Sequence, residues 1–267
     1  MTTQSVGFIG GGRVTRILLG GWRRAGRWPR QIAVCEPDPA ARGVLEQEFG
    51  TALVTSDDPA SASRTDVVVL AVHPPAVEPA LAAIRPGLRA DAVVLSLAPK
   101  VTTSRMESVL GGFSRLARAI PNAPSIVGAG FNPVAFGPRL GDAERRTVLD
   151  LLEPLGECPE VPEEDLEAYA VVSAMGPTYL WFQLAALRDL GVDFGLSPEA
   201  ATRATLRMAL GSAGVLFDGS LDASEVMDLV RVRPLAAHED AILGAYRSAL
   251  PALYEKLAGK PLAAATV

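Results

Sequence analysis

Three consecutive glycines, Gly10 to Gly12, follow a short apolar run and precede a helical pattern in the stretch SVGFIGGGRVTR. Gly10 permits a tight turn from strand to helix, and Gly12 has no Cβ, so a pyrophosphate can approach the backbone amides at the helix N-terminus. Thr15 supplies a small residue at the third position of the pattern. The stretch predicts a phosphate-binding loop, against the alternative of a glycine-rich turn that binds nothing.

An acidic residue, Glu36, ends the next apolar run, IAVCEPD. A carboxylate at the end of the second strand accepts hydrogen bonds from the ribose of a bound adenosine, and it repels the 2′-phosphate of NADP. Arg13 lies in the glycine loop with Val14 and either offsets this repulsion or binds pyrophosphate. We assign both to the cofactor site and predict NADH or NADPH as the cofactor, with a slight preference for NADH.

Short apolar runs alternate with helical patterns through the first part of the chain. Because these runs lack polar alternation, they suit parallel strands covered on both faces, which predicts a Rossmann-type doubly wound α/β sheet. After about residue 160 the sequence becomes rich in Ala and Leu with a helical texture, and the acidic segment ECPEVPEEDLE marks the junction. We predict a dinucleotide-binding domain over residues 1–160 and an all-α domain over 161–267.

Composition excludes several classes of protein. The net charge is −5 and the basic residues are scattered, so a nucleic-acid partner is not expected. No basic segment precedes an apolar one at the N-terminus, and no apolar run reaches the roughly 18 residues of a membrane span, so we expect a cytoplasmic protein. Cys35 and Cys158 lack the spacing of a disulfide framework or a metal site, and Cys35 is expected to be a small buried hydrophobe.

Five segments resemble the pyrroline-5-carboxylate reductase family: GFIGGGRV, DVVVLAVHPPAV, VVLSLAPKVTTSRMESVL, RAIPNAPSIVGAG and VSAMGPTYLWFQLAALRDLGVDFGLS. The resemblance implies a dinucleotide domain followed by a helical domain through which two subunits interlock, and hydride transfer from a reduced nicotinamide to a ring C=N bond. The stretch AVVSAMGPTYLWFQLAALRDLGV, rich in Ala, Leu and Val and with few charges, also predicts a buried interface in a homodimer or larger homo-oligomer.

The resemblance also assigns individual residues. It places Val72, His73 and Pro74 beside the nicotinamide and its ribose. It places Asn122 and Ala123 on the inner side of the cofactor, and Ser173, Gly176 and Pro177 in the substrate pocket. The Gly-Pro pair is independently expected to break or kink a helix, because proline lacks an amide donor and clashes with the preceding turn. That break frees backbone groups near the expected pocket.

The substrate region departs from the family pattern. The family loop Thr-Ser-Pro-Gly-Gly-Thr-Thr, which holds the substrate carboxylate, corresponds here to VRVRPLAAHED, residues 230–240, where Pro234 matches and the glycines and threonines are replaced. Ala174 and Met175 stand in place of Gly-Ser, and His73 in place of a lysine. Since the glycine loop is kept, we expect a reductase whose substrate differs from that of its relatives.

New side chains in this region suggest replacements for the lost groups. Arg231 or Arg233 offers a guanidinium fork for a substrate carboxylate, against the alternative of two solvated arginines. His238 can supply the proton that turns an imine into an iminium, against the alternative of a surface histidine. Thr178 and Tyr179 are alternative hydroxyl donors, and we count Ser173 with His238 and Thr178 as catalytic candidates and Met175 as a substrate contact.

Two other functions stay open from the sequence. A hydroxyacid-type dehydrogenase shares the architecture, but its lysine version is disfavoured because no lysine lies between residues 101 and 255. A non-catalytic dinucleotide sensor or scaffold is consistent with the altered loop, since a fold does not fix a function.

Overall fold

The computed structural model describes residues 4–217 and 219–262. It divides into two compact units, one formed by the chain up to Met175 together with the residues from Leu253 onward, and the other by Gly176–Ala252. The division predicted after residue 160 falls inside the first unit. Each unit is described below by itself.

The first unit is built on a seven-stranded sheet in the order β3-β2-β1-β4-β5-β6-β8, parallel except for β8, which runs antiparallel to β6. A short parallel pair, β7 and β9, lies outside it. The strands are β1 Ser5–Ile9, β2 Gln31–Cys35, β3 Val54–Ser56, β4 Val67–Leu70, β5 Val93–Ser96, β6 Leu116–Ala119, β7 Gly130–Phe131, β8 Val134–Phe136 and β9 Gly156–Glu157. This order confirms the Rossmann-type doubly wound sheet, with its reversal between β1 and β4.

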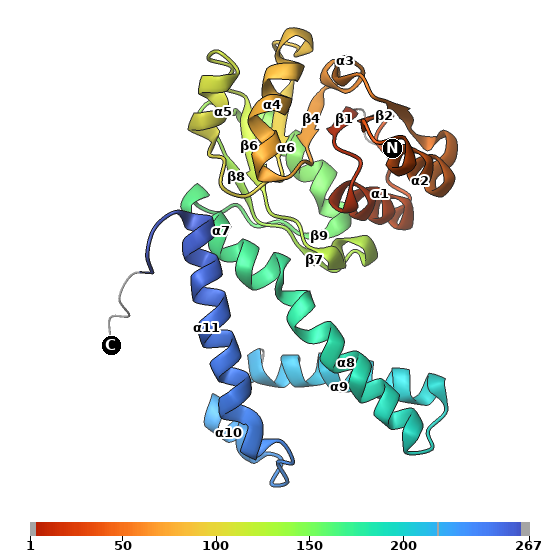
Figure 1. The fold of residues 1–267 in the computed structure, drawn as a ribbon, viewed down its shortest axis with the longest axis vertical. Coiled ribbons are helices and arrows are strands. Elements are labelled where there is room, and N and C mark those ends of the chain that lie inside the picture. The colour runs from red at the N-terminus through yellow and green to blue at the C-terminus, as the bar shows by residue number, and fades with distance from the viewer. Residues whose placement is uncertain (1–3, 218, 263–267) are drawn as a thin grey trace. The chain divides into compact units, whose positions relative to one another are not determined.

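Helices cover both faces of the sheet (Figure 1). On one face lie α1 Arg13–Ala25, α2 Pro39–Phe49 and α6 Asp142–Leu152, and on the other α3 Pro59–Ser63, α4 Pro74–Ile84 and α5 Thr103–Val109. Within β4, Val67 and Val69 belong to the first core, whereas Val68 and Leu70 belong to the second. Successive side chains of a strand point to opposite faces, so a strand buried on both sides reads as an unbroken apolar run.

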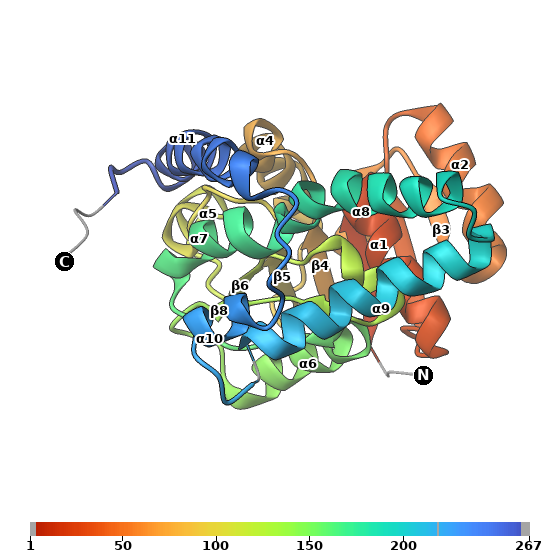
Figure 2. The same cartoon turned by 90° about the horizontal axis from the view of Figure 1, so that it is seen from below.

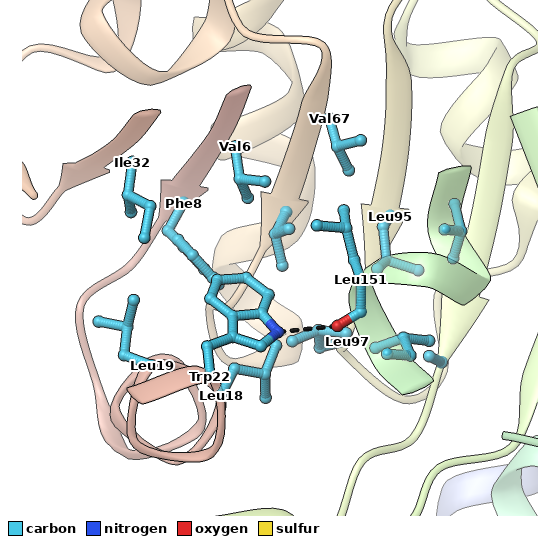
Figure 3. Close-up of a cluster of buried hydrophobic side chains, with 14 of the residues drawn as sticks. Val6, Phe8, Leu18, Leu19, Trp22, Ile32, Val67, Leu95, Leu97 and Leu151 are labelled. Carbon is cyan, nitrogen blue, oxygen red and sulfur yellow. Dashed lines mark hydrogen bonds between the residues drawn. The ribbon is translucent and has the colours of Figure 1, made fainter. Parts of the chain in front are cut away.

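Trp22 is the largest side chain in the core under α1, and only 1% of its surface is exposed. Its ring packs against Phe8 of β1 with 5.8 Å between ring centroids. Its Nε1–H donates to the carbonyl oxygen of Leu151 in α6 at 2.7 Å (Figure 3). The indole therefore ties the first helix to the last helix of the same face and satisfies a buried donor.

Every element described between Gly176 and Ala258 is helical, which confirms the all-α second half (Figure 2). The helices are α8 Gly176–Asp193, α9 Pro198–Phe217, α10 Ala223–Asp228, the 3₁₀ turn Ala236–His238, and α11 Glu239–Ala258. In the second unit α8 contacts α9. Asp222 forms a capping box with Glu225 at the start of α10. The last residues of α11 belong to the first unit, where Leu257 packs against the small core that contains Ile120.

Large apolar side chains of the second unit are exposed in the single chain, including Phe182 on α8 at 67% and Phe217 at the end of α9 at 80%.

The helical stretch Glu163–Asp193 is long and apolar enough to cross a membrane, with a mean hydropathy of 1.2 in its most apolar window. The sequence criterion of an unbroken apolar run missed this stretch. By length and composition alone it is weak support for a span, because core helices of soluble proteins pass the same test.

Candidate functional site

A cleft of about 610 Å³ lies at the carboxyl ends of β1, β4 and β5. It is lined by six of the predicted cofactor residues: Gly12, Arg13, Val14, Val72, His73 and Pro74. In open α/β sheets, ligands bind outside the carboxyl ends of the strands at the point where the strand order reverses. The cleft occupies this position, between the connection that leaves β1 and the one that leaves β4.

Gly10 shapes the turn that leads into the cleft. Its φ is +102°, and an added Cβ would lie 2.6 Å from the carbonyl oxygen of Ala71. Its amide donates to Cys35 O at 2.8 Å, and its carbonyl accepts from the buried Thr15 Oγ1 at 2.6 Å. The position therefore requires glycine, and Thr15 has a second role that the sequence pattern did not show: it locks the turn from inside the helix.

Gly12 is the N-cap of α1, in an extended conformation and with no side-chain cap. A Cβ built on Gly12 meets no atom within 4 Å. The first turn of α1 contains no acidic residue, so its backbone amides present partial positive charge to the cleft. This open space beside a helix N-terminus fits a dinucleotide pyrophosphate.

Glu36 joins the glycine loop to the segment that follows β2 through its two carboxylate oxygens. Oε2 accepts from Gly11 N at 2.8 Å, and Oε1 accepts from Asp38 N at 3.0 Å. The Arg42 guanidinium donates to the Glu36 carbonyl at 2.7 Å. Sequence reasoning assigned Glu36 to a ribose and missed this supporting role. The two roles are compatible, because each carboxylate oxygen can accept more than one hydrogen bond.

Two exposed arginines of α1 line the cleft. Arg13 is the first residue of α1, and Arg16 follows one turn later. Arg16 Nε donates to Glu48 Oε2 at 2.8 Å. Sequence reasoning missed Arg16, although the spacing of three residues places both guanidinium groups on one face of the helix.

The far side of the cleft is formed by Leu97, Ala98 and Pro99, which follow β5. Sequence reasoning missed this wall as well, since an apolar strand end carries no chemical signature. His73, at the N-cap of α4, is exposed and lines the cleft from the end of β4, and its carbonyl accepts from Ala76 N at 2.8 Å.

Asn122 and Ser173 are brought together, but they are not among the residues lining the cleft. The buried Asn122 donates from Nδ2 to Ser173 O at 3.3 Å and accepts at Oδ1 from Phe131 N at 3.1 Å. Ser173 Oγ donates to Tyr169 O at 2.8 Å. Because this bond uses the hydroxyl proton, Ser173 must break it before it can donate a proton elsewhere.

The predicted helix break is confirmed. The helix α7 Leu166–Tyr169 continues as a π-helical turn, Ala170–Ala174, and Met175 N donates to Ala170 O at 3.0 Å. The next helix, α8, begins at Gly176, so Pro177 occupies its first turn, where a missing amide costs least. Single π-helical turns are frequent at functional sites.

The remaining candidates, Thr178, Arg231, Arg233 and His238, are exposed in the second unit. Arg233 is ion-paired with Glu239, and His238 ends a 3₁₀ turn with its amide donating to Leu235 O at 2.8 Å. Tyr179 faces Tyr246, with ring centroids 5.9 Å apart. Burial, and then the neighbouring Tyr246, raises the pKa of the Tyr179 phenol, which keeps its proton at neutral pH.

The two thiols are poor nucleophiles. Cys35 is buried at the end of β2, and burial followed by the charge of Glu36 raises the pKa of its thiol. Burial raises the pKa of Cys158 to about 11. Because the thiolate is the reactive form, both side chains act as apolar groups, as expected for Cys35.

Comparison with known proteins identifies similar chains. The family model described as NADP oxidoreductase, coenzyme F420-dependent, matches residues 5–100, and the model for pyrroline-5-carboxylate reductase dimerisation matches residues 163–234. A pyrroline-5-carboxylate reductase of Pseudomonas aeruginosa is 30% identical over 96% of this chain and 93% of its own length. One of Mycobacterium tuberculosis is 35% identical over 80% of this chain and 74% of its own length.

Solved structures agree in fold. The pyrroline carboxylate reductase of Plasmodium falciparum, solved with NADP bound, superposes with a TM-score of 0.82 at 22% identity and covers 97% of this chain and 98% of its own. A pyrroline-5-carboxylate reductase from Coxiella burnetii gives a TM-score of 0.69 at 27% identity, covering 97% and 96%. The architecture of the two halves is therefore shared with these proteins along nearly the whole chain.

Proposed function

Because this chain belongs to the pyrroline-5-carboxylate reductase family, we propose that it is an NAD(P)H-dependent reductase of the C=N bond of a small cyclic imine. The observation that carries the proposal is the open space at Gly12, beside uncapped amides of α1, in a cleft at the reversal point of the sheet. A bound reduced nicotinamide supplies hydride to the imine carbon. The relatives do not favour a hydroxyacid dehydrogenase or a non-catalytic sensor.

Different residues of the chain bind different parts of the dinucleotide. The first-turn amides of α1 and Arg13 hold the pyrophosphate, and Glu36 accepts from the adenosine ribose. Val72, His73 and Pro74 contact the nicotinamide half. This assignment is supported by their common position in the cleft, or in the case of Glu36 by its bond to Gly11.

Cofactor choice rests on the charges around the adenosine ribose. The Glu36 carboxylate favours NADH, whereas Arg13 and Arg16 on the cleft wall attract a 2′-phosphate. We keep a slight preference for NADH. The ratio of kcat/KM for NADH to that for NADPH measures it, and Glu36→Gln is expected to shift the ratio towards NADPH. A wild-type ratio clearly in favour of NADPH would contradict the proposal.

The second unit forms a homodimer or larger homo-oligomer. Its exposed apolar side chains, such as Phe182, are expected to be buried against another chain. The family model for pyrroline-5-carboxylate reductase dimerisation matches residues 163–234, which include α8 and α9. Light scattering over a concentration series should show an assembly larger than one chain, and a monomer at every concentration would contradict it. A cytoplasmic location stays a prediction from the sequence.

The substrate carboxylate is held by Arg231 or Arg233, the two arginines of the altered loop. A charge-assisted hydrogen bond contributes about 1.5–3 kcal/mol, so replacing both arginines with alanine should raise the KM of a carboxylated imine about 10- to 100-fold with little change in kcat. Steady-state kinetics on a carboxylated and an uncarboxylated imine measure the effect. Arg188→Ala, an exposed arginine of the same unit, is the matched control, and equal KM values in both variants would remove the arginines from the site.

His238 supplies the proton to the imine nitrogen. Loss of a general acid lowers turnover by about 10²–10⁴-fold, so His238→Ala should lower kcat on a cyclic imine by this factor. Steady-state kinetics of the variant and the wild type measure the loss. Full turnover of the variant at every pH would leave Thr178 and Tyr179 as the remaining donors.

The test of the function is oxidation of NADH and NADPH, measured separately, against pyrroline-5-carboxylate and related cyclic imines with and without a carboxylate. We expect turnover of at least one cyclic imine, with a preference different from that of the relatives because of the altered loop. Cofactor binding without turnover on the whole panel would contradict the proposal and favour a non-catalytic role.

A further inference from the structure

Lys100 has an unusual backbone conformation at the edge of the cleft. Among the residues that the structure describes, it is the only one other than glycine with a positive φ, at +76°. A side chain with a Cβ disfavours this left-handed region, so a lysine stays there only when its surroundings hold it. Lys100 directly follows Leu97, Ala98 and Pro99, the wall of the cleft beyond β5.

The group that holds Lys100 is the carboxylate of Glu167, in α7. Lys100 N donates to Glu167 Oε1 at 2.9 Å. The same oxygen accepts from Arg118 Nη2, in β6, at 2.6 Å. Arg118 is 1% exposed and Glu167 is 7% exposed, so the ion pair is fixed in the interior, where a charge without a partner is very costly.

Glu163, one helical turn before Glu167, completes the arrangement. Its two carboxylate oxygens accept from Thr103 N at 2.7 Å and from Thr103 Oγ1 at 2.8 Å, and Arg118 Nη1 donates to Oε1 at 3.2 Å. The two glutamates therefore hold both ends of the segment 100–103. We call Arg118, Glu163 and Glu167 the Arg118 clamp.

We propose that the Arg118 clamp is a positioning device for the dinucleotide cleft: Glu167 keeps Lys100 left-handed and thereby sets the Leu97–Pro99 wall against which the cofactor binds. The proposal rests on the proposed function in one respect, the identity of the ligand in the cleft. Glu36 places the adenosine on the β2 side of the glycine loop, so the nicotinamide half lies over β4 and β5, beside this wall.

The clamp also links this wall to the helical segment that leads to the expected substrate contacts. Glu167 lies in the first turn of the α7 and π-helical segment that carries Ser173, whose carbonyl accepts from Asn122. An arginine in the interior with an Nε that has no partner is a cost to stability. A buried ion pair is by itself weak evidence of a role in stability. The Arg118 clamp lies between the cleft wall and the segment that carries Ser173, and a role in setting the geometry of these two segments accounts for its position.

The sharpest test compares two substitutions at Lys100 that both remove its charge. Lys100→Gly allows the left-handed conformation. Lys100→Pro forbids this conformation and removes the backbone N–H that donates to Glu167, while leaving the Arg118–Glu167 pair intact. The Kd of NADH and of NADPH, measured by nucleotide fluorescence without any imine, should stay within about twofold of wild type for Lys100→Gly and rise about tenfold for Lys100→Pro.

Glu167→Gln weakens the same hydrogen bond at its acceptor, because it removes the charge of the carboxylate. We expect a Kd raised about fivefold and faster exchange of the backbone amides within residues 97–101, Pro99 excepted, in the cofactor-free protein. Adding Lys100→Gly to Glu167→Gln should return the Kd to near the wild-type value, because glycine adopts the conformation without the clamp. A role in stability alone predicts a lower Tm with no such rescue. Glu164→Gln, on the same helical turn, is the matched control and should change neither measurement.

Equal Kd values for Lys100→Gly and Lys100→Pro, or no rescue of Glu167→Gln, would overturn the proposal. The exchange measurement needs no ligand. If the wild-type protein bound neither nucleotide, the proposed function would fail, and unchanged exchange of residues 97–101 in Glu167→Gln would separately overturn the clamp.

Discussion

Replacing Gly12 with aspartate is expected to abolish dinucleotide binding and leave the fold intact. A Cβ at Gly12 meets no atom within 4 Å and the backbone φ is −73°, so the side chain enters open space without strain. It carries a negative charge to the position proposed for the pyrophosphate. Two unit charges 4 Å apart near a protein surface repel by about 4 kcal/mol, which is about a thousandfold in Kd. Nucleotide fluorescence titration measures the loss, and thermal unfolding should show an unchanged Tm.

Gly10→Ala is the matched contrast, two residues earlier in the same loop. There the φ of +102° and the approach to Ala71 O make any side chain strained, and overpacking of this kind costs about 1–3 kcal/mol. Gly10→Ala should therefore lower the Tm, whereas Gly12→Asp should not. A Gly12→Asp protein that binds NADH and NADPH as tightly as wild type would show that no pyrophosphate lies at Gly12.

Removing the indole of Trp22 is expected to cause the largest loss of stability in the first unit. Trp22→Ala empties a fully buried site and should lower the free energy of unfolding by about 3–5 kcal/mol. Trp22→Phe keeps most of the apolar volume but leaves Leu151 O without its donor, a loss of about 1–3 kcal/mol. Urea unfolding followed by far-ultraviolet circular dichroism measures both, because it does not depend on the fluorescence of the replaced residue.

Trp28→Phe is the control for this comparison. Trp28 packs edge-on against Phe49 at 6.4 Å between ring centroids and is only partly buried. Its replacement should cost clearly less than Trp22→Phe. Equal losses in the two variants would mean that the hydrogen bond between α1 and α6 contributes nothing measurable.

The parallel sheet could be predicted from the sequence because its strands are buried on both faces. The unbroken run VVVL of β4 contributes alternate residues to two separate cores, as expected for a strand covered on both faces. The glycine turn was predictable for a similar local reason: Gly10 has a positive φ, which glycine adopts without strain. The break ahead of Gly176 followed from the missing amide of Pro177.

Features that depend on distant partners could not be predicted. Arg118, Glu163 and Glu167 come from β6 and from the helical segment 163–169, and no periodicity joins them to Lys100. The return of the last residues of α11 to the first unit depends on the packing of Leu257, an ordinary leucine in an amphipathic helix. The roles of Arg231, Arg233 and His238 stay predictions, because they depend on a substrate that their residue types alone do not identify.

Transfer of deuterium tests the central claim most directly. The protein is incubated with a cyclic imine and with NADH or NADPH that carries deuterium at the transferable position of the nicotinamide, and the amine product is analysed by mass spectrometry. The account predicts a product heavier by a single deuterium, located on the carbon of the former C=N bond. Nucleotide that binds but leaves every imine of the panel unreduced, or a product without deuterium from either face of the nicotinamide, would contradict it.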